Sequence, residues 1–182
     1  MDLKQRNKWL LYLNTHSWQD HLFWAGREIE REQMIVDVPT MDQIISNVFD
    51  EMLCMPTSPS DSGLECSVVG RIVASIRITG AMEKLIVVEA PMATASLIGE
   101  TMFDAEHDTL PEEEIRDAVG EIVNMIGGNV KGMCEGESTL SLPCVSVENS
   151  ELSIPDGGEQ TIVNVAGSPI LVRWHDMPVA TV

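Results

Sequence analysis

Apolar residues at positions 39–53 recur every three or four residues, which is the spacing of one face of an amphipathic helix. Prolines, serines and a glycine at residues 56–63 interrupt this pattern, because these residue types favour turns. We therefore predict a first long helix whose buried face consists of Met41, Ile44, Ile45, Val48, Phe49, Met52 and Leu53.

A second long helix is predicted at residues 110–131. It opens with Thr109-Leu110-Pro111-Glu112, where a capping box coincides with an early proline, and two more acidic residues follow in the first turn. At about 100° per residue, this helix has two distinct faces. The apolar face, expected to lie on a sheet, carries Ile115, Val119, Ile122, Ile126 and Val130, and the opposite face carries Asp117, Glu121, Asn124, Gly128 and Lys131.

The remaining apolar segments are rich in β-branched residues and are separated by turn residues, which is typical of strands. We predict two or three strands at residues 64–90, a short helix at 92–103, and further strands at 140–147, 161–165 and 169–174. This order repeats one long helix followed by about three strands. The sequence therefore predicts an α+β fold of two degenerate helix-plus-three-strand units, with two long helices packed on an antiparallel-rich sheet.

The composition excludes several classes of partner. The chain has 182 residues, and its 29 acidic and 11 basic residues give a formal charge of -18. Nucleic acids and anionic membranes attract clustered Lys and Arg, so neither is an expected partner. No apolar stretch approaches the roughly 18 residues of a membrane-spanning helix. Four cysteines without a Cys-x-x-Cys pair favour buried free thiols, and we expect a cytoplasmic protein.

The first residues differ from the rest of the chain. Residues 1–32 contain five basic and five acidic residues, together with three of the four tryptophans, Trp9, Trp18 and Trp24. Aromatic residues at helical spacing usually bury surface, so a packed appendage is preferred here over an aromatic binding cage. We predict an N-terminal helical extension at residues 1–36 and one domain at residues 37–182.

Motifs for several common chemistries are missing. The sequence has no Gly-x-x-x-x-Gly-Lys-Ser/Thr loop, no Gly-x-Gly-x-x-Gly turn, no Gly-x-Ser-x-Gly elbow and no His-Glu-x-x-His pair. The spacing of His16, His21, His107 and His175 does not suggest metal ligands. We therefore expect no metal and no cofactor of the protein's own.

Glu121 and Asn124 point outward together on the second predicted helix, among four glycines at positions 120, 127, 128 and 132. Each glycine in a helix interior costs roughly 0.8–1 kcal/mol relative to alanine. Close approach of a partner would offset that cost, and so would close packing within the chain; the sequence leaves both alternatives open. Exposed Glu and Asn three positions apart are common, so the pair alone does not indicate catalysis.

The segment Asp-Ala-Val-Gly-Glu-Ile-Val-Asn-Met-Ile-Gly-Gly-Asn-Val-Lys at residues 117–131 resembles the signature helix of the CheX/CheC family of chemotaxis phosphatases. Leu-Ser-Leu-Pro-Cys-Val at residues 140–145 and the helix at 44–53 are also similar to that family's layout, and the resemblance covers residues 38–174. CheC-like members carry a second Glu-x-x-Asn pair on the first helix. Here Glu51 is followed three residues later by Cys54, so the single pair resembles the CheX branch.

This resemblance implies hydrolysis of the aspartyl phosphate of a CheY-like response regulator, in chemotaxis or related two-component signalling. Asn124 would orient the attacking water, and Glu121 would pair with the regulator's active-site lysine. The regulator would supply the Mg²⁺, so this protein needs no metal. Asp117, Gly128 and Lys131 would form a partner-binding rim, with a solvated surface as the simpler interpretation of the two charged residues.

The family also implies a homodimer. The alternative function is that of a non-catalytic CheC-like interaction domain, which binds a receiver domain or another chemotaxis component without hydrolysing anything.

Overall fold

The computed structural model describes residues 36–60, 70–147 and 157–178 of the chain. These residues all belong to one compact unit, Ile35–Val182. The predicted helical extension at residues 1–36 lies outside the described residues, apart from its last position, so it stays a prediction. Of the helices described, none combines the length and apolar character needed to cross a membrane.

The first predicted helix is present as α2, Val38–Ser46, followed directly by the π-helical segment η2, Asn47–Met52. Asp37 caps its start, because its carboxylate accepts a hydrogen bond of 3.0 Å from the backbone N–H of Thr40. The predicted apolar face is confirmed, since six of its seven residues are buried and only Met52 is partly exposed. The wider π turns were not predicted from the apolar spacing.

The two later helices also lie close to their predicted positions, as α3, Met92–Phe103, and α4, Glu112–Gly132. All five residues of the predicted apolar stripe of α4 are buried. The predicted capping box is wrong. Pro111 occupies the N-cap position without a side-chain capping bond, and the Thr109 hydroxyl donates instead to the Glu106 carbonyl at 2.6 Å. The acidic first turn remains and stabilises the positive end of the helix dipole.

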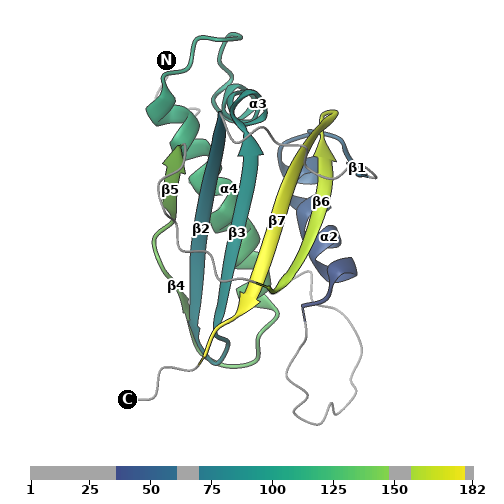
Figure 1. The fold of residues 1–182 in the computed structure, drawn as a ribbon, viewed down its shortest axis with the longest axis vertical. Helices are drawn as coiled ribbons and strands as arrows, with labels where there is room; N and C mark the ends of the chain where they lie inside the picture. The colour runs from purple at the N-terminus through teal and green to yellow at the C-terminus, as the bar shows by residue number, and fades with distance from the viewer. Residues whose placement is uncertain (1–35, 61–69, 148–156, 179–182) are drawn as a thin grey trace. The chain divides into compact units, whose positions relative to one another are not determined.

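One sheet contains every strand of the described residues, and each neighbouring pair in it is antiparallel. Its order is β1-β6-β7-β3-β2-β4, and β5 also pairs with β2. In Figure 1 both α2 and α4 lie behind this sheet, on the same face. The strands are β1 (Thr57–Pro59), β2 (Arg71–Gly80), β3 (Lys84–Pro91), β4 (Ser138–Leu140), β5 (Cys144–Val147), β6 (Glu159–Val165) and β7 (Ser168–Asp176).

The predicted α+β fold of two helix-plus-three-strand units is therefore confirmed, and the two units exchange their outer parts. The hairpins β2–β3 and β6–β7 meet in the middle of the sheet through the β3–β7 pair. The first unit's β1 pairs with β6 of the second, and the second unit's β4 and β5 pair with β2 of the first. The helices follow the same exchange, because α2 packs on β6 and α4 packs chiefly on β2.

The single strand predicted at residues 140–147 is wrong. The structure divides it into β4 and β5, with a three-residue loop at residues 141–143 between them. Pro143 has no N–H to donate to a sheet, and prolines are confined to strand ends and irregular positions for that reason. The loop remains attached to β2: the Ser141 N–H donates to the Arg77 carbonyl at 2.9 Å, and the Arg77 N–H donates to the Ser141 hydroxyl at 3.0 Å.

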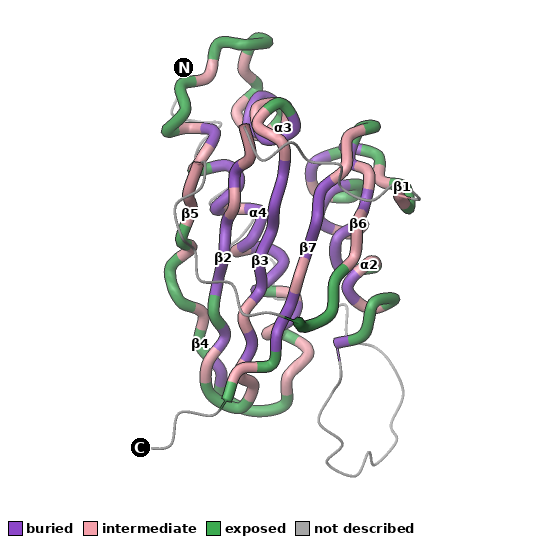
Figure 2. The backbone as a smooth tube through the Cα atoms, viewed as in Figure 1, coloured by how far each residue is buried: buried purple, intermediate pink, exposed green. Residues whose placement is uncertain are grey.

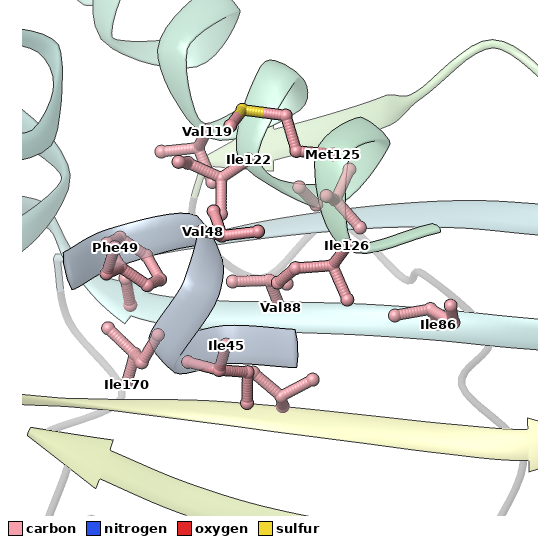
Figure 3. Packing of buried hydrophobic residues seen from close by; sticks show 14 of the residues in the cluster. Ile45, Val48, Phe49, Ile86, Val88, Val119, Ile122, Met125, Ile126 and Ile170 are labelled. Carbon is pink, nitrogen blue, oxygen red and sulfur yellow. The ribbon is translucent and has the colours of Figure 1, made fainter. Parts of the chain in front are cut away.

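The core lies between the helices and the sheet (Figure 3). Side chains from the helical side, such as Val48 and Ile122, meet Val88 and Ile170 from the sheet. All four are at most 2% exposed. Figure 2 shows the same pattern along the chain, with buried residues concentrated on the central strands and on the inner sides of α2 and α4. Burial of this apolar surface fixes both long helices on the sheet.

The opposite face of the sheet carries an ionic cluster around one buried carboxylate. Strand alternation turns Glu89 away from the helices, since its neighbours Val88 and Ala90 belong to the core. Glu89 is only 2% exposed. Its two carboxylate oxygens lie 2.6 Å from a guanidinium nitrogen of Arg71 and 3.2 Å from one of Arg173. Two cations compensate the desolvation of one carboxylate at this point.

The cysteines differ from the prediction of buried thiols. Cys54 and Cys144 are free and exposed, and Cys134 is free and half-buried. Cys66 lies outside the described residues. All three described cysteines are near chain reversals or an edge strand, where the sequence pattern gave no indication of exposure.

Candidate functional site

The outward face of α4 carries the five predicted site residues. Asp117 and Gly128 are exposed, whereas Glu121, Asn124 and Lys131 are half-buried. Helical periodicity places all five on the side away from the sheet. Asp117 and Gly128 are thus open to solvent as predicted, whereas Glu121 and Asn124 are more buried than the predicted solvent face implied.

Glu121 and Asn124 are in contact with each other. The Asn124 amide Nδ2 donates a long hydrogen bond of 3.5 Å to Oε2 of Glu121. The other carboxylate oxygen, Oε1, is buried and has no hydrogen-bond partner among the described residues. Burial raises the pKa of Glu121, and the hydrogen bond from Asn124 opposes that rise. Glu121 is therefore a carboxylate short of partners, held beside a carboxamide.

The glycines of α4 separate into two groups. A Cβ at Gly120 would lie 3.3 Å from Val145 and 3.7 Å from Pro143, and one at Gly127 would lie 2.9 Å from a methyl of Ile76. These two glycines allow the helix to pack closely on β2 and on its neighbours β4 and β5. A Cβ at Gly128 or Gly132 meets nothing within 4 Å. Packing within the chain thus accounts for the first two glycines and leaves Gly128 open to a partner.

Leu142 was missed at the sequence level. It lies in the loop between β4 and β5 and is 90% exposed. A continuous strand at residues 140–147 would have placed it on the same face as Leu140, because side chains alternate along a strand. Leu140 is half-buried beneath α4, whereas Leu142 projects into solvent. Pro143 was the signal in the sequence that the strand is interrupted there.

One group of three possible metal ligands occurs in the described residues, formed by Glu100, His107 and Asp108. The Glu100 carboxylate already accepts hydrogen bonds from the Asp108 N–H at 2.9 Å and the Ser96 hydroxyl at 3.1 Å, and His107 Nδ1 lies 3.1 Å away. The Asp108 N–H chiefly lowers the pKa of Glu100, and the bond to Glu100 chiefly raises the pKa of His107. These contacts tie the α3–α4 loop to the end of α3.

A fold of two interlocked helix-and-hairpin units with a Glu-x-x-Asn helix defines a CheC-like protein. The sequence pattern of the family described as chemotaxis phosphatase CheX matches residues 72–166, which is just over half of the chain. The protein belongs to the CheX family. The matched region includes α4 and the loop that carries Leu142. No curated protein matches the chain.

Solved structures share this fold at low sequence identity. A chain in the crystal structure of the CheX–CheY–BeF3–Mg²⁺ complex from Borrelia burgdorferi is 20% identical, with a TM-score of 0.58; the match covers 77% of this chain and 97% of that one. CheX from Vibrio vulnificus is 18% identical, with a TM-score of 0.57, over 76% and 95% of the two chains. CheX from Desulfovibrio desulfuricans is 19% identical, with a TM-score of 0.54, over 75% and 96%.

Proposed function

We propose that this protein hydrolyses the aspartyl phosphate of a CheY-like response regulator. The observation that carries the proposal is the Glu121–Asn124 pair on the outward face of α4, in a chain of the chemotaxis phosphatase CheX family. The CheX–CheY complex of a structural relative supports a receiver domain as the substrate. Mg²⁺ comes with the receiver in this proposal, and the protein contributes no metal.

The proposed role of Asn124 follows from its carboxamide. It offers both a donor and an acceptor, so it can hold a water molecule in line with the phosphorus–oxygen bond that breaks. It has no basic group near neutral pH, so it acts by orientation and not by proton removal. Activity should accordingly show no titration that belongs to Asn124 itself.

Glu121 is proposed to pair with the active-site lysine of the receiver. Its buried Oε1 has no partner among the described residues, so the carboxylate gives up no hydrogen bond at that oxygen when it turns outward to meet an ammonium group. The bond from Asn124 must open when both side chains engage the receiver. At 3.5 Å this bond is at the long limit for a hydrogen bond, so opening it costs little.

The surrounding contacts complete the proposal. Asp117 and Lys131 are proposed to contact the receiver at the rim of the site, and Gly128 lets its surface approach the helix. A homodimer is proposed from the family, and a cytoplasmic location from the sequence. The alternative function is receiver binding without hydrolysis, and the presence of both Glu121 and Asn124 on α4 weighs against it.

The test measures loss of phosphate from CheY-like receivers phosphorylated with acetyl phosphate and Mg²⁺, with and without the 182-residue chain. We expect the parent to accelerate hydrolysis, Asn124→Ala to abolish the acceleration while binding persists, and Glu121→Ala to weaken both binding and rate. Asn129→Ala is the matched control, because Asn129 lies on the same helix and donates to the Met125 carbonyl at 2.8 Å, away from the pair.

Equal rates for Asn124→Ala and the parent would disprove the water-orienting role. If the parent binds the phosphorylated receiver but does not accelerate its hydrolysis, the phosphatase proposal is wrong and the protein is a receiver-binding domain.

A further inference from the structure

Leu142 is an exposed leucine in a part of the surface that nothing in the fold requires to be apolar. It is 90% exposed, and the only other large apolar side chain that counts as exposed among the described residues is Val38, at 37%. Single exposed apolar residues are common on protein surfaces. Its significance therefore depends on how it is held and on what lies beside it.

Leu142 lies between two residues that are held in place within the loop. The preceding residue, Ser141, exchanges two hydrogen bonds with Arg77 of β2, at 2.9 and 3.0 Å. The following residue, Pro143, has a restricted backbone and packs toward Gly120 of α4. Figure 2 shows the exposed stretch of this loop between β4 and β5. A leucine presented on a fixed loop loses little conformational freedom when a partner covers it.

The residues that flank Leu142 bring its loop alongside the segment of α4 that contains Asn124. On one side of the loop, Pro143 and Val145 face Gly120, and on the other, Leu140 faces Gly127. Asn124 lies between these two glycines in the sequence of α4. At 100° per residue it is turned from them by roughly 40–60°, toward solvent. The loop that carries Leu142 thus runs along the part of α4 from which Asn124 points toward solvent.

We infer that Leu142 is an apolar contact for the phosphorylated receiver, and this inference rests on the proposed function. A receiver that brings its phosphoryl group to Asn124 occupies the solvent above the adjacent loop as well. Leu142 then supplies apolar area next to a pair whose own contacts are polar. An apolar anchor beside the reacting groups adds to the affinity for the receiver, and water orientation remains with Asn124.

The test compares the variants Leu142→Ala, Leu142→Met and Val38→Ala of the 182-residue chain on a CheY-like receiver that the parent binds or dephosphorylates. Val38 is the matched control, because it begins α2, over the β6 half of the sheet. We expect Leu142→Ala to raise KM about tenfold with kcat nearly unchanged, since truncation removes buried apolar area from the complex only. Leu142→Met and Val38→Ala should keep the KM of the parent.

Binding of the beryllofluoride-activated receiver gives a second readout in the absence of turnover, where Leu142→Ala should raise Kd by the same factor. If Asn124→Ala is inactive while Leu142→Ala matches Val38→Ala in KM and Kd, the Leu142 contact is wrong and the phosphatase proposal stands. A loss in kcat alone for Leu142→Ala also overturns the anchor. If the parent neither binds nor dephosphorylates any receiver, both proposals fail together.

Discussion

Replacing Gly128 by alanine separates the stability of α4 from its binding role. A Cβ at this position meets nothing within 4 Å, and the residue lies four positions before the end of the helix at Gly132. With no clash to oppose it, Gly128→Ala should gain the helix propensity of alanine, roughly 0.8–1 kcal/mol in the free energy of unfolding. For a domain of this size, Tm should rise by about 2–4 °C.

The same methyl group should weaken the complex with the receiver. Gly128 lies one turn from Asn124 on the same face, so a receiver seated on Asn124 has to accommodate the added carbon. Overpacking costs about 1 kcal/mol at the lower end, which corresponds to roughly a fivefold rise in KM. Thermal and urea unfolding followed by circular dichroism measure the stability, and receiver dephosphorylation measures KM.

Gly127→Ala is the matched control, with the same substitution one position earlier. Its Cβ would lie 2.9 Å from a methyl of the buried Ile76 and 3.3 Å from Leu140. Overpacking of about 1–3 kcal/mol opposes the propensity gain, so this variant should be less stable than Gly128→Ala by about that amount. Equal stability of the two variants would refute the packing described for α4. An unchanged KM for Gly128→Ala would remove Gly128 from the interface.

Two further predictions concern ionisable groups. Because burial raises the pKa of Glu121 above the ordinary value of 4.5, the kcat/KM of the parent relative to Glu121→Gln should fall with decreasing pH before a normal glutamate would protonate. Because the folded state holds this proton more tightly than the unfolded state, the raised pKa stabilises the fold below about pH 4.5, and the stabilisation is lost as the pH rises through the folded-state pKa. Glu121→Gln should therefore become more stable relative to the parent as the pH approaches neutrality. Curves of unfolding free energy against pH that run parallel for the two proteins would contradict this. Glu89→Ala should lower the free energy of unfolding, measured with urea, by roughly 2–3 kcal/mol. The reason is that the half-buried guanidinium groups of Arg71 and Arg173 lose the carboxylate that they share. A change within error of zero would show that the cluster does not stabilise the fold.

The fold was largely predictable because its long helices are strongly amphipathic. The stripe from Ile115 to Val130 specifies which side of α4 meets the sheet, and the outward position of Glu121 and Asn124 follows from it. Propensity rules misplaced the start of this helix. The Thr109 hydroxyl donates to the Glu106 carbonyl in the preceding turn instead of capping the helix, and Pro111 is the N-cap residue.

The details of the site depend on contacts between distant segments, and local patterns do not report them. The interruption of the strand at residues 141–143 arises from the bonds between Ser141 and Arg77, which are 64 positions apart. The division of the glycines into packed and open ones also requires knowledge of where β4 and β5 lie. For the same reason, the buried oxygen of Glu121 and the exposed Leu142 emerged only from the three-dimensional structure.

Because the two units exchange their outer strands, neither unit alone can pair both edges of its own hairpin. A chain interrupted between α3 and α4 would leave β2 and β6 with open edges, and such edges recruit any strand available, including those of identical molecules. Each unit therefore depends on the other to complete its part of the sheet. The segment formed by α2 and η2 has no Glu-x-x-Asn pair, but α2 covers β6 of the other unit, so the fold requires this helix even without a site on it.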